Sequence, residues 1–200
     1  MELVIGLADF IKWSCVIYGW MILGAFLLSW IHADPNNGMV RFINNATQPF
    51  WYAVSHKLPL SLVPLAPIVA LFLVDYAEVF LPGLVRSVGA MLVAGLPPET
   101  AALNIGVYAL LAGLMVLRSI MFFLGLLCVL YFIFGVVAPS LGNPIVRSVT
   151  FMIDPFLRPL QRLLPRASVD LSPVVLGLGL YIGMTAMMPL FVTLQRQLSI

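Results

Sequence analysis

The chain has 200 residues, of which 62% are hydrophobic and 9% are charged, and its formal net charge is +2. A soluble globular domain carries about 25% charged residues, so this composition excludes that class and indicates an integral membrane protein. The small net charge gives no basis for a nucleic-acid surface, and we expect no direct nucleic-acid partner.

The first predicted element is a transmembrane helix over residues 11–31. These 21 residues contain one charge, Lys12, at their edge. They are long enough to cross a hydrocarbon core of about 30 Å. Glu2 and Asp9 stand where a signal peptide would carry basic residues, so we expect this helix to remain in the mature protein.

A short amphipathic helix is predicted to start at Asn37, whose side chain can cap its first turn. At about 12 residues this helix cannot cross a membrane, so its apolar face should lie in the membrane interface or against other helices. Pro49 should end or kink it, because proline removes a helical hydrogen bond.

Pro59 and Pro67 lead into the second predicted span, which should end near Leu81. Residues 83–100 contain three glycines and the pair Pro97–Pro98, and we interpret them as a linker between two halves of the chain.

The second half begins with an apolar run over residues 100–137, interrupted by Arg118. The run contains no turn signal beside Arg118, so one long helix is predicted, with its membrane-crossing part at residues 117–137.

Asn143 and Pro144 form a typical start for the next helix. Pro155 and Pro159 should divide that helix into two short surface helices. The last predicted span covers residues 174–192.

An internal duplication relates the two halves. Residues 37–67 and 143–173 align without a gap at an offset of 106 and share ten identities. Unrelated apolar segments of this length should share only about two or three. The identical pairs are Asn37/Asn143, Val40/Val146, Arg41/Arg147, Pro49/Pro155, Phe50/Phe156, Leu58/Leu164, Pro59/Pro165, Val63/Val169, Leu65/Leu171 and Pro67/Pro173.

The duplication predicts an all-α membrane protein with four transmembrane helices in two parallel repeats, residues 1–82 and 101–200. Each repeat should place amphipathic interfacial helices between its two spans. Basic residues concentrate in these connecting segments, so the positive-inside rule places them in the cytoplasm and both termini in the periplasm. The residues counted are Arg41, Lys57, Arg147, Arg158, Arg162 and Arg166.

Asp75 and Glu78 lie within the second predicted span, where ionisable groups are costly and indicate function. Their spacing of three places them on one helix face. Lys12 and Arg118 are within plausible reach of Glu78. Two readings remain open, a structural ion pair that locks the two halves together and an ion or proton pathway.

Arg41 and Arg147 occupy equivalent positions one turn into equivalent helices. Such residues can bind lipid phosphate or an acidic partner segment, or they can hold their own loop in place. Arg158, Arg162 and Arg166 are spaced by four along one helix face and favour contact with headgroups or a partner.

The sequence offers no pattern typical of catalysis or cofactor binding. His32, Asp34 and His56 lack metal-site spacing, and no phosphate-binding glycine loop or activated nucleophile is present. Cys15 and Cys128 lie in apolar stretches and are interpreted as small buried side chains. We therefore expect no enzyme activity, no metal and no cofactor.

Several motifs of the second half resemble the signature of the YggT family, also called YlmG in cyanobacteria and plastids. They are Asn143-Pro144-Ile-Val-Arg147, Asp154-Pro155-Phe-Leu-Arg158-Pro159, Leu164-Pro165 and Asp170-Leu-Ser-Pro173. The first half resembles it more loosely, because Gly38 replaces the proline after Asn37. The resemblance implies a small bacterial inner-membrane protein with two repeats and no established reaction. It also implies links to osmotic or extracytoplasmic stress, potassium homeostasis, cell division or the assembly of membrane complexes.

Two functions follow from these patterns. The first is a non-enzymatic scaffold or accessory subunit that docks anionic lipid headgroups, a larger membrane complex or a second copy of itself. The alternative is a small channel or transporter component that uses Asp75 and Glu78.

Overall fold

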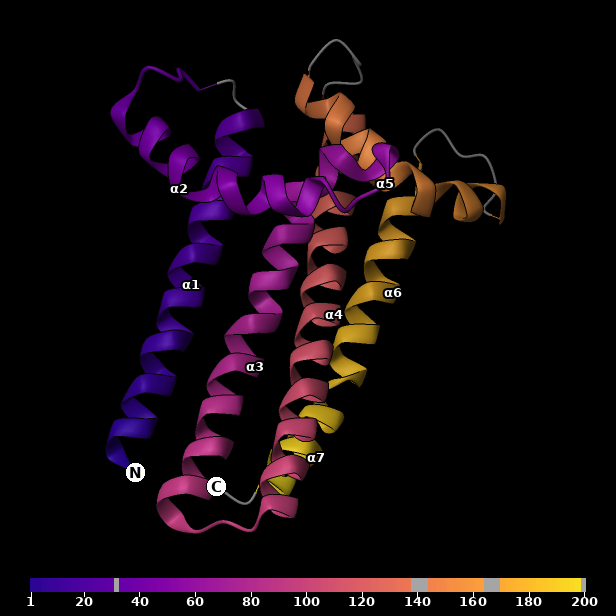
Figure 1. Cartoon of the computed structure of the whole chain (residues 1–200). Coiled ribbons are helices and arrows are strands. Elements are labelled where there is room, and N and C mark those ends of the chain that lie inside the picture. The colour runs from indigo at the N-terminus through magenta and orange to yellow at the C-terminus, as the bar shows by residue number, and fades with distance from the viewer. Residues whose placement is uncertain (31–32, 138–143, 164–169, 199–200) are drawn as a thin grey trace. The chain divides into compact units, whose positions relative to one another are not determined.

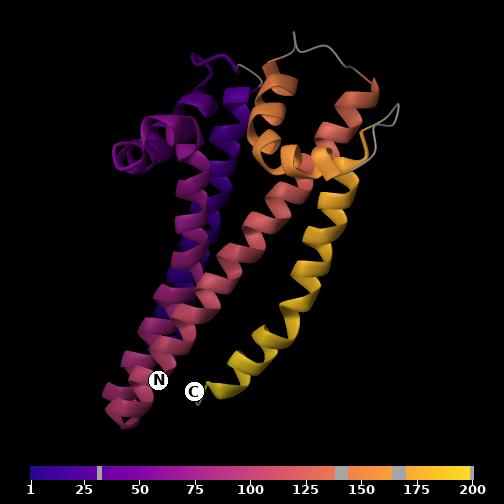
Figure 2. The same cartoon turned by 90° about the vertical axis from the view of Figure 1, so that its right-hand side faces the viewer.

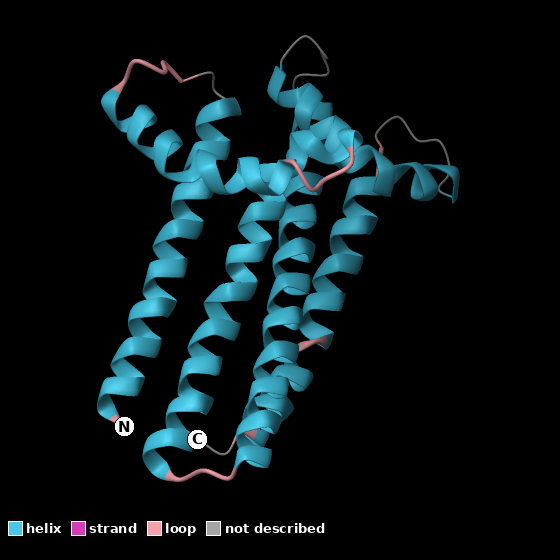
Figure 3. Ribbon diagram, viewed as in Figure 1, coloured by secondary structure: helices cyan, strands magenta, loops and turns pink. Residues whose placement is uncertain are grey.

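The computed structural model describes residues 1–30, 33–137, 144–163 and 170–198. Its regular structure in these ranges is entirely helical (Figures 1 and 3). The elements are α1 (Glu2–Trp30), α2 (Gly38–Ser55), the short 3-10 helix η1 (Leu60–Leu65), α3 (Ala66–Ala94), α4 (Pro98–Val137), α5 (Pro144–Leu163), α6 (Ser172–Ala186) and α7 (Met188–Gln197).

Four segments of this described part are long and apolar enough to cross a membrane, as in a multi-pass membrane protein. They are Glu2–Ser29, Ala66–Ala94, Pro98–Gly135 and Ser172–Gln197. The predicted helical class and the number of candidate spans are confirmed. The first of them begins at Glu2, well before residue 11, because the acidic residues near the N-terminus are accommodated within α1.

The chain divides into two compact units. The first unit comprises Met1–Leu117 with Pro189–Ile200, and the second comprises Arg118–Met188. Their boundary falls inside α4, which is one continuous helix as predicted. The repeat boundaries proposed from the sequence stay a prediction.

In the first unit, α1 and α3 pack side by side along their length (Figures 1 and 2). Ile22, Ala70 and Val74 form a buried cluster between them. Near the other end of the pair, a Cβ atom added to Gly89 would overlap the side chain of Val4. Glycine therefore permits the close approach of α1 and α3 at this point.

Helix α2 crosses α1 and α3, and its ribbon bends on the way (Figure 1). Asn37 caps it as predicted, since its side chain accepts a hydrogen bond of 2.9 Å from the backbone N–H of Met39. The helix does not end at Pro49 but continues to Ser55. The residues after Pro49 pack against the Ile22 cluster, and this burial offsets the lost hydrogen bond.

Most of residues 83–100, which we interpreted as a linker between the two halves, is helical, and the second predicted span does not end near Leu81. Helix α3 continues past Leu81 through Pro82 and Gly83, which are both buried, and ends at Ala94. The break falls at Gly95, whose φ of 71° is a left-handed conformation that favours glycine.

In the second unit, α5 is a single helix that contains Pro155 and Pro159, so the prediction of two short helices is wrong. Val149, Ile153 and Leu157 are completely buried at helical spacing, and their packing holds the helix together across both prolines. Its ribbon nevertheless changes direction (Figure 1).

The last predicted span, residues 174–192, is interrupted. Helix α6 ends at Ala186, and α7 begins at Met188 after a turn at Met187. Pro189 explains the break, because it cannot donate a backbone hydrogen bond to Thr185.

Candidate functional site

Helix α2 is anchored to the middle of α1. The hydroxyl of Tyr18 donates a hydrogen bond of 3.2 Å to the backbone carbonyl of Ala46. The Tyr18 ring also meets Phe50 edge to face, with centroids 5.8 Å apart. These neutral contacts fix α2 on both sides of Pro49.

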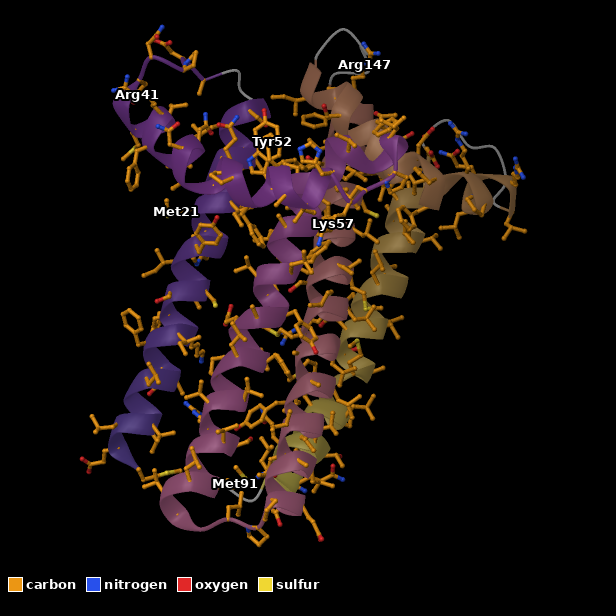
Figure 4. The ribbon with its side chains drawn as sticks, viewed as in Figure 1. Met21, Arg41, Tyr52, Lys57, Met91 and Arg147 are labelled. Atoms are coloured by element: carbon orange, nitrogen blue, oxygen red, sulfur yellow. The ribbon has the colours of Figure 1, made fainter. Side chains whose placement is uncertain are left out.

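The outward face of α2 carries a hollow of about 320 Å³ at its proline bend. Asn45, Gln48, Pro49 and Tyr52 line it. The Tyr52 ring is 48% exposed and stacks on Trp51 at a centroid distance of 4.5 Å. Figure 4 shows Arg41 at the start of the helix and Tyr52 on its second arm. The hollow therefore combines amide groups with an aromatic face.

Helix α5 carries an internal ion pair and is attached to α6 through a carboxylate. Both Nε and Nη2 of Arg158 donate to one carboxylate oxygen of Asp154, at 3.1 and 2.8 Å. Gln161 donates to Asp170 at 2.7 Å, and the backbone N–H of Ser172 donates to the other oxygen of Asp170 at 2.9 Å. The Asp170 carboxylate thus ties the end of α5 to the start of α6.

These bonds control the ionisation of Asp170. Burial by itself raises the pKa of this carboxyl, but the hydrogen bonds from Ser172 and Gln161 outweigh it and hold the pKa below its ordinary value of 3.8. Tyr131 of α4 and Asp154 of α5 lie nearby in the same unit.

The predicted surface arginines are exposed where the structure describes them. Arg41 on α2 and Arg147, Arg158 and Arg162 on α5 all have exposed side chains. Arg158 differs from the others because its guanidinium already pairs with Asp154. The remaining predicted arginine, Arg166, lies outside the described residues, as do Asn143, Pro165 and His32.

Four of the predicted prolines lie at or just before the start of a helix. Pro59 precedes η1, Pro67 lies in the first turn of α3, and Pro173 lies in the first turn of α6. Pro144 is the first residue of α5.

A row of charged side chains lies between α1 and α3. Asp75 and Glu78 of α3 are half-buried, and Lys12 of α1 interacts electrostatically with Glu78. Both helices of this pair belong to the first predicted repeat, so Lys12 and Glu78 connect its two spans and not the two halves of the chain. Arg118 belongs to the second unit.

An ion pair that the sequence did not predict extends this row. Nη2 of Arg86 lies 2.6 Å from Oδ1 of Asp9. Arg86 was assigned to the linker because of Gly83 and Gly89, whereas it lies inside α3. The two partners are 77 residues apart, so no local spacing could reveal the pair.

Within the described ranges, no three His, Cys, Asp or Glu side chains are grouped so that they could hold a metal ion.

A family model described as CCB3/YggT matches residues 4–85 and 107–191. The two matched stretches correspond to the two halves of the internal duplication. No curated protein and no solved structure matches the chain.

Proposed function

The chain belongs to the CCB3/YggT family, and from this membership we propose that it is a non-enzymatic scaffold or accessory subunit of a bacterial inner membrane. In this proposal α2 and α5 lie at the cytoplasmic surface. They dock anionic lipid headgroups together with an acidic segment of a larger membrane complex or a second copy of the chain.

The observation that supports this function most directly is the pairing of exposed arginines with firmly attached surface helices. Arg41 and Arg147 are exposed at equivalent positions of α2 and α5. Each helix is tied to its neighbours by its own contacts, Tyr18 to Ala46 in one case and Gln161 to Asp170 in the other. A basic side chain beside an anionic membrane surface contributes about 1 kcal/mol of attraction.

The test replaces both arginines at once, Arg41→Gln with Arg147→Gln. Lipids and proteins that co-purify in mild detergent are then identified. We expect fewer anionic lipids and loss of the co-purifying complex. Arg196→Gln is the matched control, because Arg196 is an exposed arginine of α7. Unchanged lipid and protein partners in the double variant would rule out docking through these helices.

A channel or transporter component remains a second candidate, because charges line the α1–α3 contact. Asp9, Lys12, Glu78 and Arg86 all contribute to this row. Ion flux through purified protein in liposomes, lost on Asp75→Asn or Glu78→Gln, would favour transport over the scaffold. Absence of flux in the wild-type protein would remove this candidate.

A further inference from the structure

We propose that the hollow on α2 binds the ammonium group of a phosphatidylethanolamine headgroup, with the headgroup phosphate next to Arg41. This inference rests on the proposed function, because it requires α2 to lie at headgroup depth.

The lining of the hollow can accept hydrogen bonds. The side chains of Asn45 and Gln48 each carry a carbonyl oxygen. Pro49 has no N–H, so the backbone carbonyl of Asn45 does not receive its usual helical hydrogen bond. Tyr52 is 48% exposed, and the ring face that does not stack on Trp51 can attract a cation. The amide nitrogens of Asn45 and Gln48 can donate, whereas the carbonyl oxygens and the ring can together engage a donor with a positive charge.

The second copy of the duplication shows what occupies the equivalent place. At the offset of 106, Gln48 corresponds to Asp154 and Tyr52 corresponds to Arg158, on either side of Pro49 and Pro155. In α5 the Arg158 guanidinium is bound to Asp154 by two hydrogen bonds. In α5 a guanidinium of the chain thus lies beside the residue that aligns with Gln48. In α2 the uncharged Tyr52 stands in place of this arginine and lines the hollow.

Arg41 restricts the type of cationic group that the hollow can bind. It lies one turn before Asn45, and its side chain is exposed. A purely cationic ligand would be repelled by this guanidinium, whereas a zwitterion can turn its phosphate toward Arg41 and its ammonium toward the hollow. A primary ammonium can donate three hydrogen bonds to the amide oxygens. A choline group can donate none, so ethanolamine is favoured over choline.

The experiment measures which lipid the purified protein retains. Protein in detergent is mixed with equal amounts of phosphatidylethanolamine and phosphatidylcholine of the same acyl chains. Native mass spectrometry then identifies the bound lipid and quantifies the fraction of protein that carries it. We expect one phosphatidylethanolamine bound with about a tenfold preference, equivalent to about 1.4 kcal/mol. Gln48→Leu with Tyr52→Leu should reduce the preference to less than about twofold. Met39→Ala changes an exposed residue of α2 outside the hollow and should keep it.

A second variant copies the α5 arrangement into α2. Gln48→Asp with Tyr52→Arg should fill the hollow with the chain's own guanidinium and abolish the preference. It places a charged pair on an exposed helix face, so the helical circular dichroism of the protein should not change. Equal binding of the two lipids to the wild-type protein would overturn the inference, and so would an unchanged preference in this variant.

Two further measurements separate the possible failures. Retention of anionic phosphatidylglycerol, reduced by Arg147→Gln in α5, reports on the proposed function and not on the hollow, because Arg147 takes no part in the site on α2. Water-soluble phosphoethanolamine at an equal concentration should not displace the bound lipid, because it lacks acyl chains. Displacement would identify a soluble ligand and overturn the assignment to a lipid.

Discussion

Replacing Arg86 by glutamine should leave Asp9 without its ion-pair partner between α1 and α3. The pair joins α1 to α3 at 2.6 Å. Asp9 precedes Ile22, which packs beside α2, by 13 residues, or about 20 Å at 1.5 Å per residue. In the arrangement that we propose, α2 lies at the membrane surface, and this depth then falls within a hydrocarbon core of about 30 Å.

The expected loss follows from the cost of a lone charge at that depth. A charged side chain at the centre of a membrane helix costs about 2.5–3.5 kcal/mol. Asp9 lies beyond the centre and is 49% exposed, so Arg86→Gln should lower the free energy of unfolding by about 2 kcal/mol. Asp9→Asn with Arg86→Gln removes both charges. It also removes Nε of Arg86, which is buried and has no hydrogen-bond partner in the described part of the chain. The double variant should therefore lie within about 0.5 kcal/mol of the wild type.

The assay is reversible unfolding by sodium dodecyl sulfate in mixed micelles, followed by circular dichroism, on both single variants and the double variant. Arg196→Gln controls for the loss of an exposed arginine. If the double variant loses as much stability as the two single variants together, the pair makes no coupled contribution and the reasoning is refuted.

Three further predictions use the same unfolding measurement or hydrogen exchange. Tyr18→Phe removes the hydrogen bond to Ala46 and should lower the free energy of unfolding by about 0.5–1.5 kcal/mol; an unchanged midpoint would contradict this anchor. Gly89→Ala should destabilise the protein by about 1–3 kcal/mol relative to Gly6→Ala, because a Cβ at Gly89 would overlap the side chain of Val4, whereas a Cβ at Gly6 would meet nothing within 4 Å. The pKa of Asp170 is lower in the folded protein than its ordinary value of 3.8, so this carboxylate stabilises the fold at pH values above 3.8. The contribution is lost as the pH falls through the lower folded pKa. Acid should therefore lower the protection factors of amides at the end of α5 in the wild type, measured against the intrinsic exchange rate at each pH, and Asp170→Asn should remove that dependence; the same acid profile of protection in both proteins would count against the tie.

The apolar runs were sufficient to predict the helical class and the four candidate spans, because an uncharged stretch of this length has few alternatives in a membrane. Prolines were harder to interpret. Pro49 and Pro155 lie inside continuous helices, whereas Pro189 coincides with a break. The difference depends on what packs beyond the proline, and tertiary contacts of this kind leave no local pattern in the sequence.

The candidate sites were likewise predictable from the sequence only where they depend on local spacing. The spacing of four between Asp154 and Arg158 was visible in the sequence, and the structure brings the two side chains together. The contact of Arg86 with Asp9 was not visible, because it depends on how two distant helices align. The hollow on α2 was also missed, since it arises from the bend at Pro49 and from neutral side chains.

The two surface helices are fastened by different kinds of contact, and this has a consequence for a cell whose environment changes. Aromatic packing and a neutral hydrogen bond hold α2, and added electrolyte hardly weakens either of them. Hydrogen bonds from Gln161 and Ser172 to the Asp170 carboxylate tie the end of α5 to α6, and mobile ions screen an exposed charge of this type over a distance of about 8 Å at physiological ionic strength. A rise in salt should therefore loosen the end of α5 and leave α2 in place.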